Sequence, residues 1–300
     1  MSQPVHNAAL PFAAAALGIA SFSIMDVVMK GLSIGMGAYN AMLWRTLIAL
    51  AIASALFVWR KNRWPERPVI RLHVWRGVVI SLMAFLFFYG LIHVPLAEAI
   101  ALSFIAPLIA LYLAAALLTE RIGGKAIFAS LIGFSGALVI VAAKLGGEYS
   151  DEVGKGIGAI LMSAVLYAYN LILQRRQALV AEPIEIAFFQ NGTVVATYLL
   201  FAPLLAVVPP ADTLPELALA GVLGIISLLL MSWAYARAQA RMLITVEYTA
   251  FIWAALFGWL VFAENVTLTT VAGTALIVTG CLVAARQQPD RVDHVESTAV

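Results

Sequence analysis

Apolar residues fill most of this chain in long runs that short polar segments interrupt. A bilayer core of about 30 Å needs roughly 20 apolar residues per helix, so runs of this length predict membrane-spanning helices. Charged residues and Pro, Gly or Asn mark their boundaries. Ten spans are predicted, at approximately 10–32, 40–59, 74–93, 96–118, 124–144, 155–174, 184–207, 216–236, 241–262 and 267–286. The connections are short, and none is long enough to form a soluble domain.

The residue pattern of the first half of the chain recurs in the second half, 144 positions later. Glu120, for example, corresponds to Glu264. The same offset pairs Gly136 with Gly280. Since each half has an odd number of spans, the second copy must enter the membrane from the opposite side. The pattern therefore predicts an all-α integral membrane protein with ten transmembrane helices in two inverted five-helix repeats, 8–144 and 155–286, and a disordered cytoplasmic tail, 287–300.

Composition agrees with a membrane protein and excludes several classes of site. The 300 residues are 63% hydrophobic and 11% charged, which is more apolar surface than a soluble core of this size can bury. The single cysteine, Cys281, excludes a disulfide within the chain and a thiolate metal cluster. A net charge of +2 gives no reason to expect a nucleic-acid partner. No phosphate-binding loop is present, so we expect no nucleotide and no other cofactor.

The distribution of basic residues predicts the orientation. With the N-terminus inside, the cytoplasmic segments hold 14 of the 18 Lys and Arg residues, whereas the outer connections hold only Lys144 and Lys155. Cytoplasmic loops of membrane proteins are enriched in these residues, so both termini are expected in the cytoplasm. No Lys or Arg precedes the first apolar run, and a cleaved signal peptide is not expected.

The repeated pattern also resembles a known family. Its parts are a proline within the fourth span, a glutamate after the fourth and ninth spans, and glycines in the fifth and tenth: Pro107, Glu120, Glu264, Gly133, Gly136, Gly273 and Gly280. Over residues 8–286 this is similar to EamA-type members of the drug/metabolite transporter superfamily, and within them to YddG-type amino-acid exporters of bacterial inner membranes. The resemblance implies a ten-helix exporter with a central cavity walled by helices 1, 3, 4, 6, 8 and 9. Phe251 departs from it by replacing the proline of the ninth span.

Ionisable residues inside the membrane are costly and are therefore candidates for function. Asp26 and Arg45 lie at similar depth in the first two spans, which predicts a buried pair that either bridges the helices or couples transport to protons. Lys30, one turn after Asp26, is an alternative partner. His93 begins the short hairpin between the third and fourth spans, which we expect to move as a stiff unit. Asp26, Arg45 and His93 form the predicted gating and coupling set.

The residues predicted to contact substrate come from the middle and the ends of the spans. Pro107 removes the normal hydrogen bond of the Ser103 carbonyl, and a free carbonyl at membrane depth favours a cavity beside it and Phe104. Glu247 is a candidate for binding an ammonium group, while Glu264 is expected to cap the helix that follows it. Packing remains the alternative role for each aromatic. The full predicted set is Tyr89, Ser103, Phe104, Pro107, Tyr169, Asn170, Trp233, Glu247, Tyr248 and Trp253.

An enzyme is not expected. A serine or aspartyl intramembrane protease needs a histidine or a second aspartate at depth, whereas His73 is expected outside the membrane and Asp26 is the one intramembrane aspartate. Four scattered histidines and one cysteine do not supply a metal site. We therefore expect an inner-membrane secondary transporter or facilitator that exports amino acids or similar small amphipathic metabolites by alternating access. Its partners are the solute and the lipid bilayer, and a monomer suffices. Export of a purine, a drug-like cation or a sugar derivative is the alternative, and a passive channel is a further one.

Overall fold

The computed structural model describes residues 9–61, 63–118, 124–145, 151–235, 237 and 246–285, and every regular element in this part of the chain is helical. Six helices are long and apolar enough to cross a membrane, and three shorter ones are apolar as well, so the chain is a multi-pass membrane protein. The helices are α1 (Ala9–Met36), α2 (Ala38–Trp59), α3 (Arg67–His93), α4 (Leu96–Ser103), α5 (Ala106–Leu118), α6 (Gly124–Leu145), α7 (Asp151–Ala178), α8 (Pro183–Leu199), α9 (Ala202–Leu205), α10 (Leu214–Tyr235), α12 (Ala250–Phe262) and α13 (Leu268–Ala285), with a 3-10 turn, η1 (Ala211–Thr213).

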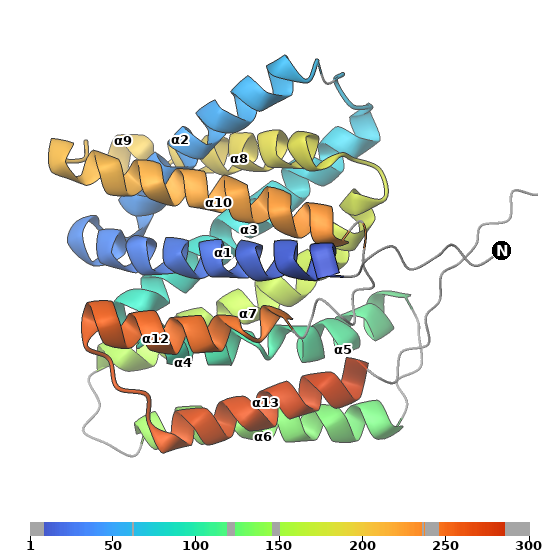
Figure 1. Ribbon diagram of the computed structural model, residues 1–300, viewed down its shortest axis with the longest axis vertical. Helices are drawn as coiled ribbons and strands as arrows, with labels where there is room; N and C mark the ends of the chain where they lie inside the picture. The colour runs from blue at the N-terminus through green and yellow to red at the C-terminus, as the bar shows by residue number, and fades with distance from the viewer. Residues whose placement is uncertain are drawn as a thin grey trace, which may run out of the picture.

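The helices of the two halves alternate across the bundle. At one edge α6 lies along α13, and at the opposite edge α2 packs on α8 (Figure 1). Between them, α1 packs along α10 and α3 along α7. Adding 144 to the residue numbers of α1 and α3 gives those of α7 and α10 to within about a turn, so these two helix pairs are the same contact made twice. The core therefore consists of contacts between halves.

In the contact between α6 and α13, the repeat relation between the halves is visible at single residues. A Cβ at Gly136 would lie 2.4 Å from the Gly273 carbonyl oxygen, and one at Gly280 would lie 2.6 Å from the Ala129 carbonyl oxygen. Position 129 plus 144 is 273, and 136 plus 144 is 280, so each contact is the image of the other. Glycine is required at these positions because the two backbones touch there.

The expected fourth span, 96–118, is interrupted, although Leu96–Leu113 is long and apolar enough to cross a membrane. It is divided into α4 and α5 by a turn at Phe104 and Ile105. Pro107 is the second residue of α5, a position where the missing N–H costs little, and the chain starts a new helix instead of continuing the old one. The backbone N–H of Ile105 bonds to the Leu102 carbonyl at 3.2 Å, the tighter spacing of a helix end.

The second half has the same break without a proline. Tyr248 and Thr249 form a turn before α12, and these positions are 104 and 105 plus 144. The bounds of α5 and α12 also differ by 144 at both ends. The first residues of the expected span 241–262 lie outside the described residues, as do Glu120 and the expected tail 287–300.

Other helix boundaries differ from the predicted spans. α1, α3 and α7 extend beyond the spans 10–32, 74–93 and 155–174, and in α3 and α7 the added residues include charged ones. The expected span 184–207 ends early. α8 stops at Leu199, and α9 follows as a single helical turn with Pro203 as its second residue.

Candidate functional site

Two buried polar clusters lie towards opposite ends of the bundle. α3 connects them, since Arg76 is near its start and Val94 directly follows its end. The separation of 18 positions in sequence corresponds to about 27 Å at 1.5 Å per residue. We call these the Arg76 end and the Lys30 end. Ionisable groups buried in a membrane protein mark the places where function is concentrated.

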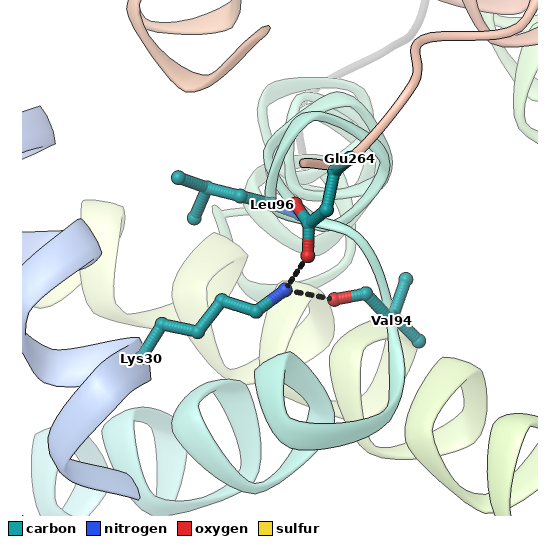
Figure 2. Close-up of polar contacts among 4 residues, drawn as sticks. All are labelled: Lys30, Val94, Leu96 and Glu264. Atoms are coloured by element: carbon teal, nitrogen blue, oxygen red, sulfur yellow. Dashed lines mark hydrogen bonds and ion pairs between the residues drawn. The ribbon is translucent and has the colours of Figure 1, made fainter. Parts of the chain in front are cut away.

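Lys30 is the centre of the first cluster. Its side chain is 4% exposed, and its ammonium forms an ion pair with the Glu264 carboxylate. It also donates a hydrogen bond of 2.9 Å to the Val94 carbonyl oxygen, as Figure 2 shows. The Phe262 ring lies 5.2 Å from the same ammonium. Lys30 belongs to the first half and Glu264 to the second, so this contact closes the space between the halves at the Lys30 end.

The second oxygen of the Glu264 carboxylate accepts a 2.7 Å hydrogen bond from the backbone N–H of Leu96, the first residue of α4. Glu264 therefore caps α4, in the other half, and the expectation that it caps the helix following it is wrong. The helix start is a favourable place for a negative charge, because the unpaired N–H groups there carry partial positive charge. Close by, Thr270 donates to the buried Glu98 carboxylate at 3.3 Å.

The expected ion pair between Asp26 and Arg45 is not formed. The guanidinium group of Arg45 lies 3.2 Å from the Met25 sulfur and 3.4 Å from the Thr46 hydroxyl. One oxygen of the Asp26 carboxylate has no hydrogen-bond partner among the described residues. Asp26 and Arg45 have similar depth, but the side of α1 that faces the second half carries Lys30, which pairs with Glu264. Their predicted role in coupling stays a prediction.

The second cluster surrounds Arg76. Its Nε donates to the Asn170 amide oxygen at 2.9 Å, one terminal nitrogen donates to Gln177, and the other lies 3.5 Å from Gln174. These three amides are spaced at i, i+4 and i+7 on α7, which places them on one face against α3. Arg76 is 5% exposed and was not among the predicted site residues.

His73 extends the Arg76 cluster to α8. The ring is fully buried, contacts the Gln177 amide through Nδ1 and lies 2.9 Å from the Glu185 carboxylate through Nε2. It stacks on Phe189 with centroids 4.8 Å apart. His73 is buried within the bundle because α3 starts at Arg67, seven positions before the predicted span, and its expected place outside the membrane stays a prediction. Both His73 and Arg76 are on one face of this extra length.

The predicted aromatics Phe104 and Tyr248 meet in mid-bundle, at the two helix breaks. Their rings are 5.1 Å apart and nearly perpendicular, at 87°. The Cys281 thiol donates to the Phe104 carbonyl at 3.2 Å, which satisfies a group left free by the break. Ser103 donates to the Ala99 carbonyl at 2.9 Å, and Pro107 is exposed. The break therefore brings the two halves together at repeat-related positions.

The other predicted site residues are dispersed. The rings of Tyr89 and His93 lie edge to face at the Lys30 end, with centroids 5.1 Å apart, and His93 lies 3.8 Å from the Glu152 carboxylate. At the Arg76 end, the guanidinium of Arg237 covers the Trp233 ring at 4.4 Å. The Trp253 ring stacks on Phe257 at 5.7 Å.

Tyr169 is not grouped with the other predicted residues. Its hydroxyl accepts a 3.0 Å hydrogen bond from Trp75, a side chain that is 55% exposed. Tyr167, two residues earlier and on a different helix face, is the tyrosine that interacts electrostatically with both Arg76 and Glu247. Helix periodicity would have identified it, since Tyr167 is one turn before Asn170. No group of three potential metal ligands occurs within the described part of the chain.

A surface groove of about 440 Å³ opens at the Lys30 end, between the end of α1 and the segment before α10. None of the predicted substrate residues lines it. Its residues include Gly35, Asn40 and Pro209.

A multi-pass helical bundle in which two similar halves enclose buried charges at either end belongs to the class of small-molecule membrane transporters. The EamA-like transporter family matches this chain twice, over residues 10–142 and 154–286, and the chain belongs to that family. The resemblance found in the sequence is thus confirmed.

Curated relatives differ in the solute they carry. The pseudopaline exporter CntI of Pseudomonas aeruginosa is 29% identical over 91% of this chain and 94% of its own length. A riboflavin transporter of Brucella anthropi is 25% identical over 81% and 86%. An S-adenosylmethionine uptake transporter of Rickettsia felis is 22% identical over 89% of both chains. A crystal structure with 23% identity, covering 91% of this chain and 96% of its own, has a TM-score of 0.61 and supports the fold.

Proposed function

We propose that this protein is a secondary transporter of the bacterial inner membrane that exports amino acids or similar small amphipathic metabolites. Both termini lie in the cytoplasm, and the two five-helix repeats, 8–144 and 155–286, are inverted and together make ten membrane-spanning helices. The paired contacts α1–α10 and α3–α7 support this layout, because a two-fold relation between halves produces each inter-half contact twice.

The observation that carries the proposal is an asymmetry between repeat-related positions. Lys30 is 3% exposed and bound to Glu264 of the other half. Gln174, which is position 30 plus 144, is exposed. Alternating access requires that repeat-related positions at the two ends differ in their contacts, since exchanging the two arrangements moves the opening to the other side, and the difference between Lys30 and Gln174 supports this.

The solute class follows from the relatives and the polar groups. S-adenosylmethionine, carried by one relative, is itself an amino-acid derivative, and the described helices hold both buried cations and buried carboxylates. Relatives include both exporters and an uptake protein, so the direction of export rests on the resemblance to YddG-type proteins and on the pseudopaline exporter. Export of a purine, a drug-like cation or a sugar derivative through the same fold is the alternative.

Counterflow in proteoliposomes tests the proposal. Vesicles loaded with unlabelled L-amino acids should accumulate the labelled form, and competition by purines, riboflavin and organic cations defines the range. Saturable counterflow with an exchange ratio near one supports a carrier. Flux that rises linearly with solute concentration and shows no counterflow would instead identify a channel.

A further inference from the structure

Arg76 carries a buried charge that no carboxylate among the described residues pairs with directly. Its three contacts, Asn170, Gln174 and Gln177, are neutral amides, and no ion pair to Arg76 is present in the described ranges. The nearest acid in the network, Glu185, is bound to His73 and reaches Arg76 only through His73 and Gln177. Lys30, the other buried cation tied into a network, has a carboxylate partner. Amide oxygens stabilise a guanidinium group but leave its net charge in place.

The guanidinium group has donors to spare. It has five N–H groups in a planar fork, and the contacts to the three amides use one on each nitrogen. One N–H therefore remains on each terminal nitrogen, the pair that a carboxylate accepts in a bidentate arrangement. The weakest contact, 3.5 Å to Gln174, involves a side chain that is exposed and free to turn away.

A tyrosine lies on the same face of α7 as these amides. Tyr167 is one turn before Asn170 and interacts electrostatically with Arg76. Tyr248, which contacts Phe104 at the helix breaks, also interacts electrostatically with Tyr167.

We propose that Arg76 binds the carboxylate of the transported solute, displacing Gln174. Asn170 and Gln177 hold the guanidinium plane for this contact, and His73 and Glu185 hold Gln177. This assignment rests on the proposed function and narrows the substrate class to solutes with a carboxylate, above all zwitterionic α-amino acids.

Binding measured by calorimetry on the purified protein tests the assignment. The ligands are L-phenylalanine, 2-phenylethylamine, which lacks the carboxylate, and 3-phenylpropionate, which lacks the ammonium. The variants are Arg76→Gln, Arg76→Lys and, as a matched control, Arg71→Gln, an exposed arginine on the same helix. Arg76→Gln should weaken L-phenylalanine and 3-phenylpropionate binding by roughly tenfold or more and leave 2-phenylethylamine within about twofold.

The remaining results separate the outcomes. Arg76→Lys should fall between wild type and Arg76→Gln, since it keeps the charge without the fork, and Arg71→Gln should bind as wild type does. A purely structural role for Arg76 would lower binding of all three ligands together, and that result overturns the assignment. So does failure of the wild type to bind either carboxylate. Counterflow of L-phenylalanine that is unchanged in Arg76→Gln refutes this site while leaving the transporter proposal intact. If no counterflow occurs but carboxylate binding still depends on Arg76, the transporter proposal is refuted and the binding site stands.

Discussion

At the residue scale, one carboxylate serves both halves of the molecule. One oxygen of Glu264 is paired with Lys30 and the other accepts the N–H of Leu96, so opening the Lys30 end breaks an ion pair and removes a helix cap together. Neither contact is replaced by water at low cost in a buried site. Closure at this end is therefore expected to be all-or-none.

The Lys30–Glu264 pair should show strong coupling. Lys30→Met leaves the Glu264 carboxylate buried without its counter-ion, at an expected cost of about 3 to 5 kcal/mol, and the double variant Lys30→Met, Glu264→Gln should cost clearly less than the sum of the single changes. Melting temperatures in detergent measure this. Lys155→Met, at an exposed lysine on α7, should melt as the wild type does. Additive losses would mean that the pair does not hold the helices.

Asp26 and Arg45 should be less strongly coupled. They form no salt bridge but interact electrostatically at longer range, so the coupling between Asp26→Asn and Arg45→Gln is expected to be smaller than that of the Lys30–Glu264 pair. The same thermal series checks this. A coupling of several kcal/mol would show that the two side chains meet in another conformation of the transporter.

At the element scale, two helices are broken at the same place in each half. Pro107 made a kink predictable in the first half. The separation into two helices depends in addition on the tight helix end formed by Ile105 and Leu102. The second break has no proline signal, because Phe251 occupies that position, and it became visible only from the turn at Tyr248 and Thr249. The internal repeat does indicate this break, because a break at Phe104 implies one 144 positions later, at Tyr248.

Close packing of α6 and α13 gives a prediction at this scale. Gly136→Ala places a Cβ about 2.4 Å from the Gly273 carbonyl oxygen, a distance that the two backbones relieve only by moving apart. We expect a loss of about 1 to 3 kcal/mol. Gly158→Ala in α7, where a Cβ meets nothing within 4 Å, is the control and should be neutral or slightly stabilising. Thermal unfolding in detergent compares the two, and equal stability would show that the contact is loose.

At the scale of the whole molecule, hydrophobic runs predicted where the helices lie because bilayer thickness fixes their length. They did not predict which side chains meet, because that depends on helix rotation. Asp26 and Lys30 are one turn apart, and the depth argument fits either, yet Lys30 alone reaches the second half. Arg76 was counted only as a cytoplasmic charge, since the sequence does not reveal that α3 begins at Arg67 and that α7 carries a matching face of amides.

The proposed orientation in the membrane is open to a direct measurement. Single cysteines near Arg63 and near Gly147, introduced into Cys281→Ala, are expected to react with impermeant reagents from opposite sides, with position 63 protected in intact cells and position 147 labelled. The basic residues gathered in the cytoplasmic segments are the reason. Labelling of both positions from outside would contradict the inverted ten-helix arrangement.

The contact between Phe104 and Tyr248 has a consequence for how such a chain diverges. In a dimer of two identical repeats, position 104 would meet its own copy on the symmetry axis, and every substitution there would be made twice at one contact. Joining the repeats in one chain removes that restriction, so the two partners change one at a time. Here one ring has a hydroxyl, beside the Cys281 thiol, and the other has none. Positions on the axis are therefore where a fused transporter can first lose its symmetry and acquire a preference for one end of its solute.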